Sequence, residues 1–223
     1  MVIIMLGAPG TGKGTVAAIL QEKLGIKQVS TGDIFRKAIK EKTEVGVKAA
    51  EYIDKGMLVP DEIVIKVIEE RLAEPDLKDG AILDGFPRTE EQALELEKML
   101  AKYGKKVDMA INLSSPEEEI IWRVSNRRVC TNQNCKTVYN VIMNPPNVEG
   151  ICDKCGSNLV LRKDDTEETV RERLKTYNET AQPIIDLYEK KGVLFSSVVS
   201  NRINHLAEDV VKEVIEELKN KEQ

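Results

Sequence analysis

A glycine-rich segment near the start of the chain combines backbone flexibility with one lysine. Residues 7–15 read GAPGTGKGT and fit the spacing G-x-x-x-x-G-K, which ends at Lys13. Glycines let backbone N–H groups and a following helix N-terminus approach phosphate oxygens, and the lysine adds a mobile positive charge. The usual motif continues with Ser or Thr, but here Gly14 follows and the hydroxyl comes at Thr15. The segment therefore predicts a phosphate-binding loop whose magnesium ligand differs from the usual one.

Two further segments carry arginines to positions where strands should end. Residues 30–36 (STGDIFR) lie at a predicted strand-to-helix junction, and residues 83–88 (LDGFPR) end another predicted strand. Ligands of open parallel sheets bind at such carboxyl ends. Arg36 and Arg88 could clamp a phosphate with paired donors. The alternative for both is a surface salt bridge.

Two aspartates in these segments could hold magnesium through water molecules. Asp84 follows three apolar residues and needs a strong partner, either hydrated Mg²⁺ or buried hydrogen bonds. Asp33 is the second candidate, although it could instead be the third residue of a capping box that begins at Ser30.

Four cysteines form two close pairs. Four residues separate Cys130 from Cys135, two separate Cys152 from Cys155, and sixteen lie between the pairs. This spacing favours a tetrahedral Cys₄ site for structural Zn²⁺, and iron fits the same ligands. Free thiols are the alternative. Disulfides are disfavoured because we expect a cytoplasmic protein: no signal peptide or membrane span is evident.

The charge is acidic overall and basic locally. The chain has 33 Lys and Arg against 38 Asp and Glu, with 41% hydrophobic and 4% aromatic residues. This balance suits an ordinary globular protein and argues against nucleic-acid and membrane binding. Residues 123–163 reverse the trend with seven basic and two acidic residues. Any anion should therefore bind near this segment.

Four arginines flank the cysteine segment. Arg123 and Arg127, four residues apart on a predicted helix, should share a face. Arg162 and Arg173 border the next helix, so all four could converge on one cleft and neutralise phosphate groups. Alternatively, they are solvated or pair with nearby acids. Those acids are Asp164, Asp165 and Glu168.

The elements that must position these groups are strands alternating with helices. This alternation predicts an α/β fold with a five-stranded parallel sheet. Apolar runs predict strands at 2–6, 28–30, 80–84, 107–113 and 193–199. Helical spacing predicts helices at 13–24, 31–41, 44–55, 61–73, 89–103, 115–128, 164–190 and from about 204. Two stretches interrupt the alternation, one all-helical and one β-rich with the cysteines.

Local signals refine three of these helices. Thr89 and Gln92 predict a capping box, and Ser115 predicts an N-cap followed by proline and acids. Pro183 predicts a bend in the long helix. The single histidine, His205, is expected to be an exposed helix-start residue without a role.

Residues 7–15 resemble the phosphate loop of nucleoside monophosphate kinases, which also have glycine after the lysine. The segments at 30–36 and 83–88 look like the monophosphate site of adenylate kinases, and residues 144–146 (NPP) and 148–150 (VEG) match the lid of their long bacterial form. The resemblance implies a phosphate-loop core at 1–29, 74–128 and 162–223, an AMP-binding helical insert at 30–73, and a zinc-stapled β-rich lid at 129–161.

The resemblance also implies site residues. Those for ATP are Gly10, Thr11, Gly12, Lys13, Gly14, Thr15, Arg123, Arg127, Val138 and Tyr139. Those for AMP are Thr31, Arg36, Met57, Leu58, Val59, Gly85, Phe86, Pro87, Arg88, Gln92, Arg162 and Arg173. The catalytic group would be Lys13, Arg88, Arg123, Arg162 and Arg173. An amide at Gln92 can read adenine because it both donates and accepts, but the predicted capping box would compete for it.

The sequence departs from the family in two places. Family lids with zinc usually have two residues inside the first cysteine pair, not four. The family often has a glycine before the last helix, where residues 200–203 read SNRI, so an adenine contact is not carried over there.

The implied activity is reversible phosphoryl transfer from MgATP to AMP, giving two ADP, in a monomer. Such transfer requires positioning and charge neutralisation and no general base, because the acceptor phosphate is already anionic. One alternative is a kinase for UMP or CMP, and the large insert argues against it. Another is a zinc-ribbon nucleic-acid-binding ATPase or switch. A regulatory GTPase lacks support because no Asn-Lys-x-Asp segment is present.

Overall fold

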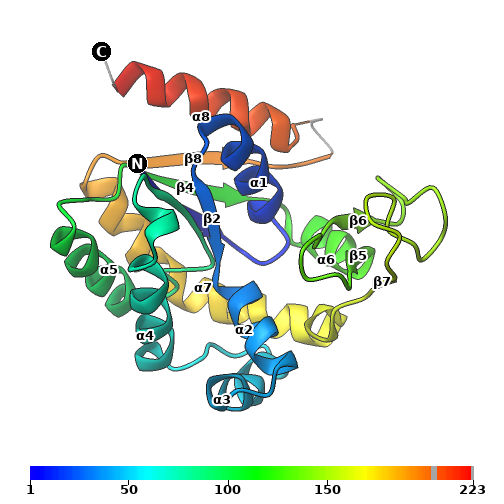
Figure 1. Cartoon of the computed structure of the whole chain (residues 1–223). Coiled ribbons are helices and arrows are strands. Elements are labelled where there is room, and N and C mark those ends of the chain that lie inside the picture. The colour runs from blue at the N-terminus through cyan, green and yellow to red at the C-terminus, as the bar shows by residue number, and fades with distance from the viewer. Residues whose placement is uncertain (202–204, 222–223) are drawn as a thin grey trace.

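The computed structural model describes residues 1–201 and 205–221. Its centre is a five-stranded parallel sheet with the order β2-β3-β1-β4-β8 (Figure 1). The strands are β1 (Val2–Gly7), β2 (Lys27–Ser30), β3 (Ala81–Asp84), β4 (Met109–Ser114) and β8 (Leu194–Val198). β1 is buried up to Leu6 because both faces of the sheet are covered, and this explains its continuous apolar run. The predicted sheet is confirmed.

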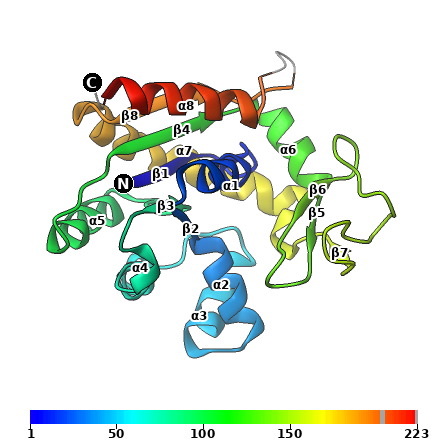
Figure 2. The same ribbon diagram turned by 45° about the horizontal axis from the view of Figure 1, so that its top comes forward.

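Helices cover both faces of the sheet and form two hydrophobic cores (Figure 2). α1 (Lys13–Leu24) and α8 (Ala207–Lys221) cover one face. α5 (Glu90–Lys102) and α7 (Glu167–Lys190) cover the other face, where Tyr188 of α7 lies fully buried in the interior. A short 3₁₀ helix (Pro75–Leu77) precedes β3. The strand ends that carry the candidate residues are thus held between two packed layers.

The helical insert, residues 30–73, comprises α2 (Thr31–Lys40), α3 (Glu44–Ile53) and α4 (Asp61–Leu72). Ser30 and Thr43 cap α2 and α3 with their hydroxyl oxygens. α2 and α3 pack so closely that a Cβ on Gly46 would lie 2.1 Å from the carbonyl oxygen of Ala38. Glycine is therefore required where the two helices meet.

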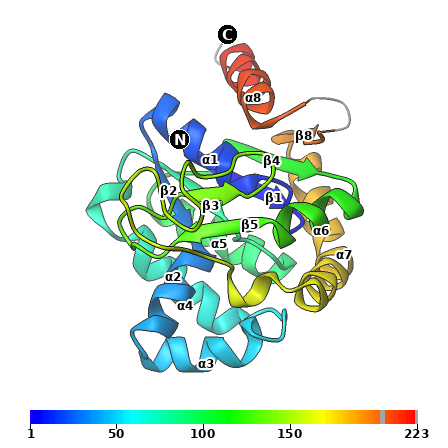
Figure 3. The ribbon, with the colours of Figure 1, turned by 90° about the vertical axis from the view of Figure 1, so that its right-hand side faces the viewer.

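The cysteine insert, residues 129–161, belongs to a second, antiparallel sheet, which lies at the right in Figure 1 and faces the viewer in Figure 3. Its strands are β5 (Arg127–Cys130), β6 (Val138–Asn140) and β7 (Leu159–Val160). β5 pairs with both of the others, and Val129 lies opposite Val160. α6 (Glu117–Ser125) leads into this sheet and a 3₁₀ helix (Lys163–Asp165) leads out.

The predicted helix at 115–128 is too long at both ends. α6 ends at Ser125, and Arg127 already pairs with Asn140 in the antiparallel sheet. Arg123 and Arg127 therefore do not share a helix face. The N-cap is Pro116 without a side-chain bond, since the Ser115 hydroxyl donates to the carbonyl of Val199 instead. The predicted acids in the first turn are confirmed.

Two helix starts also differ from the predictions. The long helix begins at Glu167, because Thr166 is its N-cap and the two preceding aspartates lie in the 3₁₀ turn. Pro183 lies inside this helix as predicted. α8 begins at Ala207, and the predicted start at residue 204 lies outside the described residues.

His205 is not an exposed helix-start residue. It lies in an isolated β-bridge with Ser200, and its ring bonds the carbonyl of Val198 and the carboxylate of Glu213. These two bonds raise the pKa of His205. None of the described helices combines the length and apolar composition that crossing a membrane requires.

Candidate active site

The phosphate loop, residues 7–15, connects β1 to α1 and adopts a conformation that only glycine allows at key points. Gly12 is the N-cap of α1 with φ 96°, and Gly10 has φ 84°. A Cβ on Gly10 would also lie 2.6 Å from Val124 Cγ2. Thr11 is fully buried, and its hydroxyl donates to the carbonyl of Ala8. The N-terminus of α1 therefore follows directly on the loop, which is the arrangement that a phosphate-binding loop needs.

Lys13 folds back over this loop. Its ammonium group donates to the carbonyl oxygens of Gly7 and Ala8, both at 2.7 Å. Desolvation lowers the pKa of Lys13 to about 7, with Asp84 acting against this shift and Arg88 adding to it. Neutral carbonyls are weak partners for an ammonium group. A phosphate oxygen would therefore displace them and restore the full charge of the lysine.

Four arginines surround two aspartates at the start of α7. This arginine cluster consists of Arg36, Arg127, Arg162 and Arg173. Arg127 binds the fully buried Asp165 with two bonds of 2.8 and 2.5 Å. Arg173 binds Asp164 at 3.1 Å and lies 3.7 Å from Asp165. Arg36 also pairs with Asp33 at 2.6 Å, and four cations against three anions still leave a positive surplus for a polyanion.

The pKa values in this cluster reflect the crowding of charge. Desolvation alone would raise the pKa of Asp164, but Arg173 and Arg36 outweigh it and lower that pKa. Desolvation and the neighbouring Arg36 lower the pKa of Arg162 to about 10. Its Nε atom is buried and has no hydrogen-bond partner within the described part of the chain. Arg162 thus keeps one buried donor that no group of the described chain satisfies.

The salt-bridge alternative is confirmed for Arg127 and Arg173, which pair with Asp165 and Asp164. Arg36 and Arg173 also line cavities at this site, whereas Arg127 and Arg162 line neither of the two. Arg173 lines two adjoining cavities, one larger than the other, and Arg88 and Gly85 line both as well. The larger cavity also reaches Lys13. Two ligands placed in these cavities would meet at Arg88 and Arg173.

Arg88 remains open to solvent at this junction. Its Nε donates to the carbonyl of Gly85 at 2.8 Å. The protein atoms around it remove part of its hydration and lower the pKa of Arg88 to about 10, and the charge of Arg173 adds to this shift. Arg88 stays positively charged at neutral pH and can pair with a phosphate.

The smaller cavity lies at the helical insert and brings most of the predicted AMP residues together. Members of that prediction on its wall are Thr31, Arg36, Met57, Leu58, Val59, Gly85, Arg88, Gln92 and Arg173. Thr31 donates its hydroxyl to the carbonyl of Gly85 at 2.8 Å. Phe86 is fully buried and Pro87 lines only the larger cavity.

Gln92 does not complete the predicted capping box. The Thr89 hydroxyl accepts the Gln92 N–H at 3.2 Å, so half of the box is confirmed. The Gln92 side chain does not return to Thr89. Its Oε1 accepts the Arg88 N–H at 2.8 Å, and its Nε2 donates to Asp61 at 2.7 Å.

Arg123 lies apart from the arginine cluster. It binds Glu119 at 3.1 Å and also donates to the Val199 carbonyl and the Asn201 side chain. Glu119 in turn accepts from Ser200 Oγ and Asn201 N. Arg123 therefore connects α6 to the segment that follows β8. Arg202 and Ile203 of the SNRI segment lie outside the described residues.

The two aspartates named for magnesium differ in their surroundings. Asp84 Oδ2 lies 3.6 Å from the position of a Cβ on Gly14, at the head of α1, and accepts from Gln28 Nε2 at 3.1 Å. It suits a water-bridged cation beside the phosphate loop. Asp33 is bound by Arg36 at 2.6 Å and lies 3.7 Å from Lys136. Desolvation alone would raise the pKa of Asp33, but Arg36 outweighs it and lowers that pKa. Asp33 is therefore already neutralised by protein cations.

The four cysteines converge as predicted. Their sulfur atoms all lie within 4.8 Å of one another, with 3.3 Å between Cys130 and Cys155 and 3.7 Å between Cys135 and Cys152. A zinc ion with Zn–S bonds of about 2.3 Å separates its sulfurs by roughly 3.8 Å in a tetrahedron. All four thiols are free of disulfides. Although four residues separate Cys130 from Cys135, the Cys135 sulfur still reaches the cluster. The cluster has the size that tetrahedral coordination of a metal ion requires.

The two nucleotide contacts predicted on β6 face different ways. Val138 is exposed, but the Tyr139 side chain is buried against the cysteines, with its hydroxyl 3.7 Å from Cys152 Sγ. The same hydroxyl accepts the Asp153 N–H at 2.9 Å. Only the backbone of Tyr139 is available to a ligand, because its ring forms the core of the cysteine insert.

Comparison with known proteins decides the family. A family model described as adenylate kinase matches residues 5–193. The chain belongs to the adenylate kinase family. The adenylate kinase of Archaeoglobus fulgidus is 53% identical over 195 residues, which cover 87% of this chain and 89% of that protein.

Relatives that span nearly the whole chain agree. The adenylate kinase of Caldicellulosiruptor saccharolyticus is 49% identical over 212 residues, covering 95% of this chain and 98% of that protein. The adenylate kinase of Staphylococcus aureus is 46% identical over 211 residues, covering 95% and 97%. The family is thus supported on both sides of the helical and cysteine inserts.

Sequence reasoning missed two carboxylates of this family member. Glu119 was not singled out, although its spacing of four from Arg123 indicated a pair. Asp61 was not singled out, since nothing local indicates that the start of α4 lies against Gln92.

Proposed function

We propose that this chain transfers a phosphoryl group reversibly from MgATP to AMP, giving two ADP. One observation supports this most directly: Arg88 and Arg173 form a common wall of two adjoining cavities, and the phosphate-loop lysine lies in one of them. Two mutually repelling nucleotides need such a shared cationic wall to bring their phosphates into line. Membership of the adenylate kinase family supports the same reaction.

Individual roles follow from the contacts. Lys13 and the phosphate-loop amides would hold the ATP phosphates, while Arg36 and Arg88 would hold the AMP phosphate. Arg162 and Arg173 would neutralise the transferring group. Arg127 would act on ATP through the arginine cluster, and Arg123 would act from the α6 side. No general base is needed for this step.

Magnesium fits beside the phosphate loop. Asp84 would hold it through water molecules, and the ion would supply charge neutralisation on the outer phosphates. Asp33 would serve instead as the partner of Arg36, because both of its neighbours are cations.

We further propose that the helical insert is the AMP-binding unit and that the cysteine insert closes over ATP as a lid. The four cysteines would hold a structural Zn²⁺ that stabilises a segment with too small a core to fold without one. A monomer suffices for this mechanism, because every proposed residue comes from one chain. Metal analysis of the purified protein separates zinc from iron.

The test is a coupled assay that offers AMP, UMP, CMP and GMP separately with MgATP. AMP should be the preferred acceptor, and preference for UMP or CMP would replace the proposal with the related pyrimidine kinase. Lys13→Met should lower kcat/KM about a hundredfold or more, since it removes a charge that binds the transferring phosphates. Lys23→Met, on the outer face of the same helix, is the matched control. Full activity of Lys13→Met would refute the site.

A further inference from the structure

Gln92 is buried with only 1% of its surface exposed, yet it lines the cavity proposed for AMP. Both ends of its amide have protein partners of fixed polarity. Oε1 accepts the Arg88 N–H at 2.8 Å, and a backbone N–H can only donate. Nε2 donates to Asp61 Oδ1 at 2.7 Å, and a carboxylate can only accept. The two bonds therefore permit one orientation of the amide.

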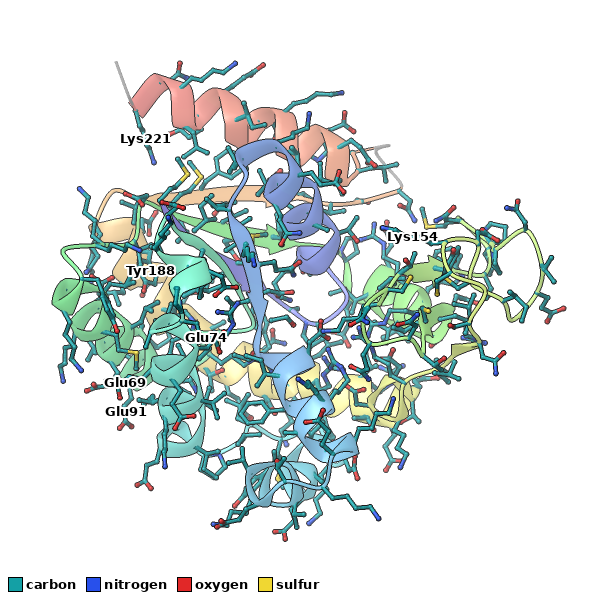
Figure 4. The ribbon with its side chains drawn as sticks, in the orientation of Figure 1. Glu69, Glu74, Glu91, Lys154, Tyr188 and Lys221 are labelled. Atoms are coloured by element: carbon teal, nitrogen blue, oxygen red, sulfur yellow. The ribbon has the colours of Figure 1, made fainter. Side chains whose placement is uncertain are left out.

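Asp61 is itself held in place from α5. Its second oxygen, Oδ2, accepts the Thr89 hydroxyl at 2.6 Å, so both carboxylate oxygens bond to the start of that helix. Glu69 on α4 and Glu91 on α5 instead lie on the outer surface of these helices (Figure 4). Asp61 does not line either cavity adjoining Arg88. Gln92 lines the smaller cavity and is bonded to Asp61, so it connects Asp61 to a ligand there.

The fixed amide retains one donor and one acceptor. An amide nitrogen carries two hydrogens and an amide oxygen has two lone pairs, so each keeps one after bonding to the protein. Adenine matches this pair, because its 6-amino group donates and the adjacent ring nitrogen accepts. A 6-oxopurine, such as the base of IMP, reverses both: its 6-oxygen accepts and its N1–H donates. An amide free to turn over would accept either base.

We propose that Asp61 is a positioning residue that makes the site specific for AMP over 6-oxopurine monophosphates by preventing the Gln92 amide from turning over. This inference rests on the proposed function of the cavity. Turning the amide with Asp61 present would place two oxygens against each other and two N–H groups against each other. Without the carboxylate, only the Arg88 N–H still opposes the turn.

The experiment compares AMP with IMP, which differ only at the base edge described above. In Asp61→Asn the new amide can donate to a turned Gln92, so KM for AMP should rise and KM for IMP should fall. The ratio of kcat/KM for AMP over IMP should drop about tenfold or more, as expected when one buried hydrogen-bond mismatch is removed. A purely structural role would change both substrates alike and leave the ratio unaltered.

Glu62→Gln is the matched control, because it removes the same charge from the same first turn of α4 at an exposed position. It should leave the ratio unchanged. Asp61→Ala gives a second variant should the first fold poorly, and the ratio must fall there as well. In wild-type protein, NMR should show one Gln92 side-chain N–H shifted downfield by the carboxylate, and Asp61→Asn should abolish that shift.

The outcomes separate the two proposals. If the wild type phosphorylates AMP and rejects IMP, but both Asp61 variants keep that ratio, the role of Asp61 is wrong and the proposed function stands. If the wild type phosphorylates neither monophosphate, the proposed function itself fails. A wild type that uses AMP and IMP equally also overturns the role of Asp61.

Discussion

Two bidentate arginine–aspartate pairs among the described residues have similar geometry and different burial, and comparing them tests the role of burial. Arg127 binds Asp165, whose side chain is fully buried, and Arg71 binds Asp76, whose side chain is 32% exposed. Asp165→Asn leaves the partly buried guanidinium charge of Arg127 without its anion. Removing one partner of a buried ion pair costs about 3–5 kcal/mol, and we expect about 3 because Arg127 is 18% exposed.

This energy corresponds to a measurable shift in melting temperature. At about 2.1 cal/mol/K per residue, a chain of 223 residues has an unfolding entropy near 0.5 kcal/mol/K. Asp165→Asn should therefore lower Tm by about 6 °C in differential scanning calorimetry. Asp76→Asn should lower it by only about a degree, because exposed pairs are screened by water.

Nucleotide should partly reverse the loss. ADP phosphates would neutralise the arginine that Asp165 no longer pairs, so the rise in Tm on adding saturating MgADP should be larger in Asp165→Asn than in the wild type. Equal losses in Asp165→Asn and Asp76→Asn would refute the argument from burial. A smaller rise in Tm with MgADP would refute the competition between aspartate and phosphate.

Three further predictions test other parts of the molecule. Gly46→Ala should push α3 away from the Ala38 carbonyl and lower the free energy of unfolding by about 1–3 kcal/mol. It should also raise KM for AMP with little change in KM for ATP. The control Val47→Ala, at an exposed position on the same helix, should change neither stability nor KM. Lys13, with a pKa of about 7, should be mostly neutral at pH 8 and become charged when MgATP binds. Titration calorimetry of MgATP binding in two buffers should therefore detect proton uptake at pH 8. The uptake should disappear below about pH 6, where Lys13 is already charged, and also in Lys13→Arg. Chelating a metal bound by the four cysteines should remove hydrogen-exchange protection from residues 129–161 and leave the parallel sheet protected. A loss of protection throughout the chain would contradict the view that this metal stabilises only the cysteine insert.

The parallel sheet was predictable because its signals are local. Val2 to Leu6 are all buried, so the apolar run alone indicates a strand covered on both faces. The phosphate loop was predictable for a similar reason, since its glycines adopt positive φ where other residues would be strained.

What the sequence could not show depends on distant partners. Arg127 continues a helical pattern, and only its pairing with Asn140 makes it part of a strand. Whether the arginines were solvated or paired depended on the complete burial of Asp165, which packing alone determines. The bond between Asp61 and Gln92 joins residues 31 apart on two different helices. Such contacts become visible only when the tertiary arrangement is known.

The pairing of β5 with β7 has a consequence for how this architecture can vary. Val129 lies opposite Val160, so the chain leaves the core and returns to it at adjacent points. The intervening thirty residues therefore form one insertion whose two ends lie side by side. Replacing the insertion by a shorter or longer link would change the entropic cost of closing the loop only slightly, because that cost grows slowly with loop length. The whole module could be trimmed, enlarged or exchanged while the backbone on either side keeps its path.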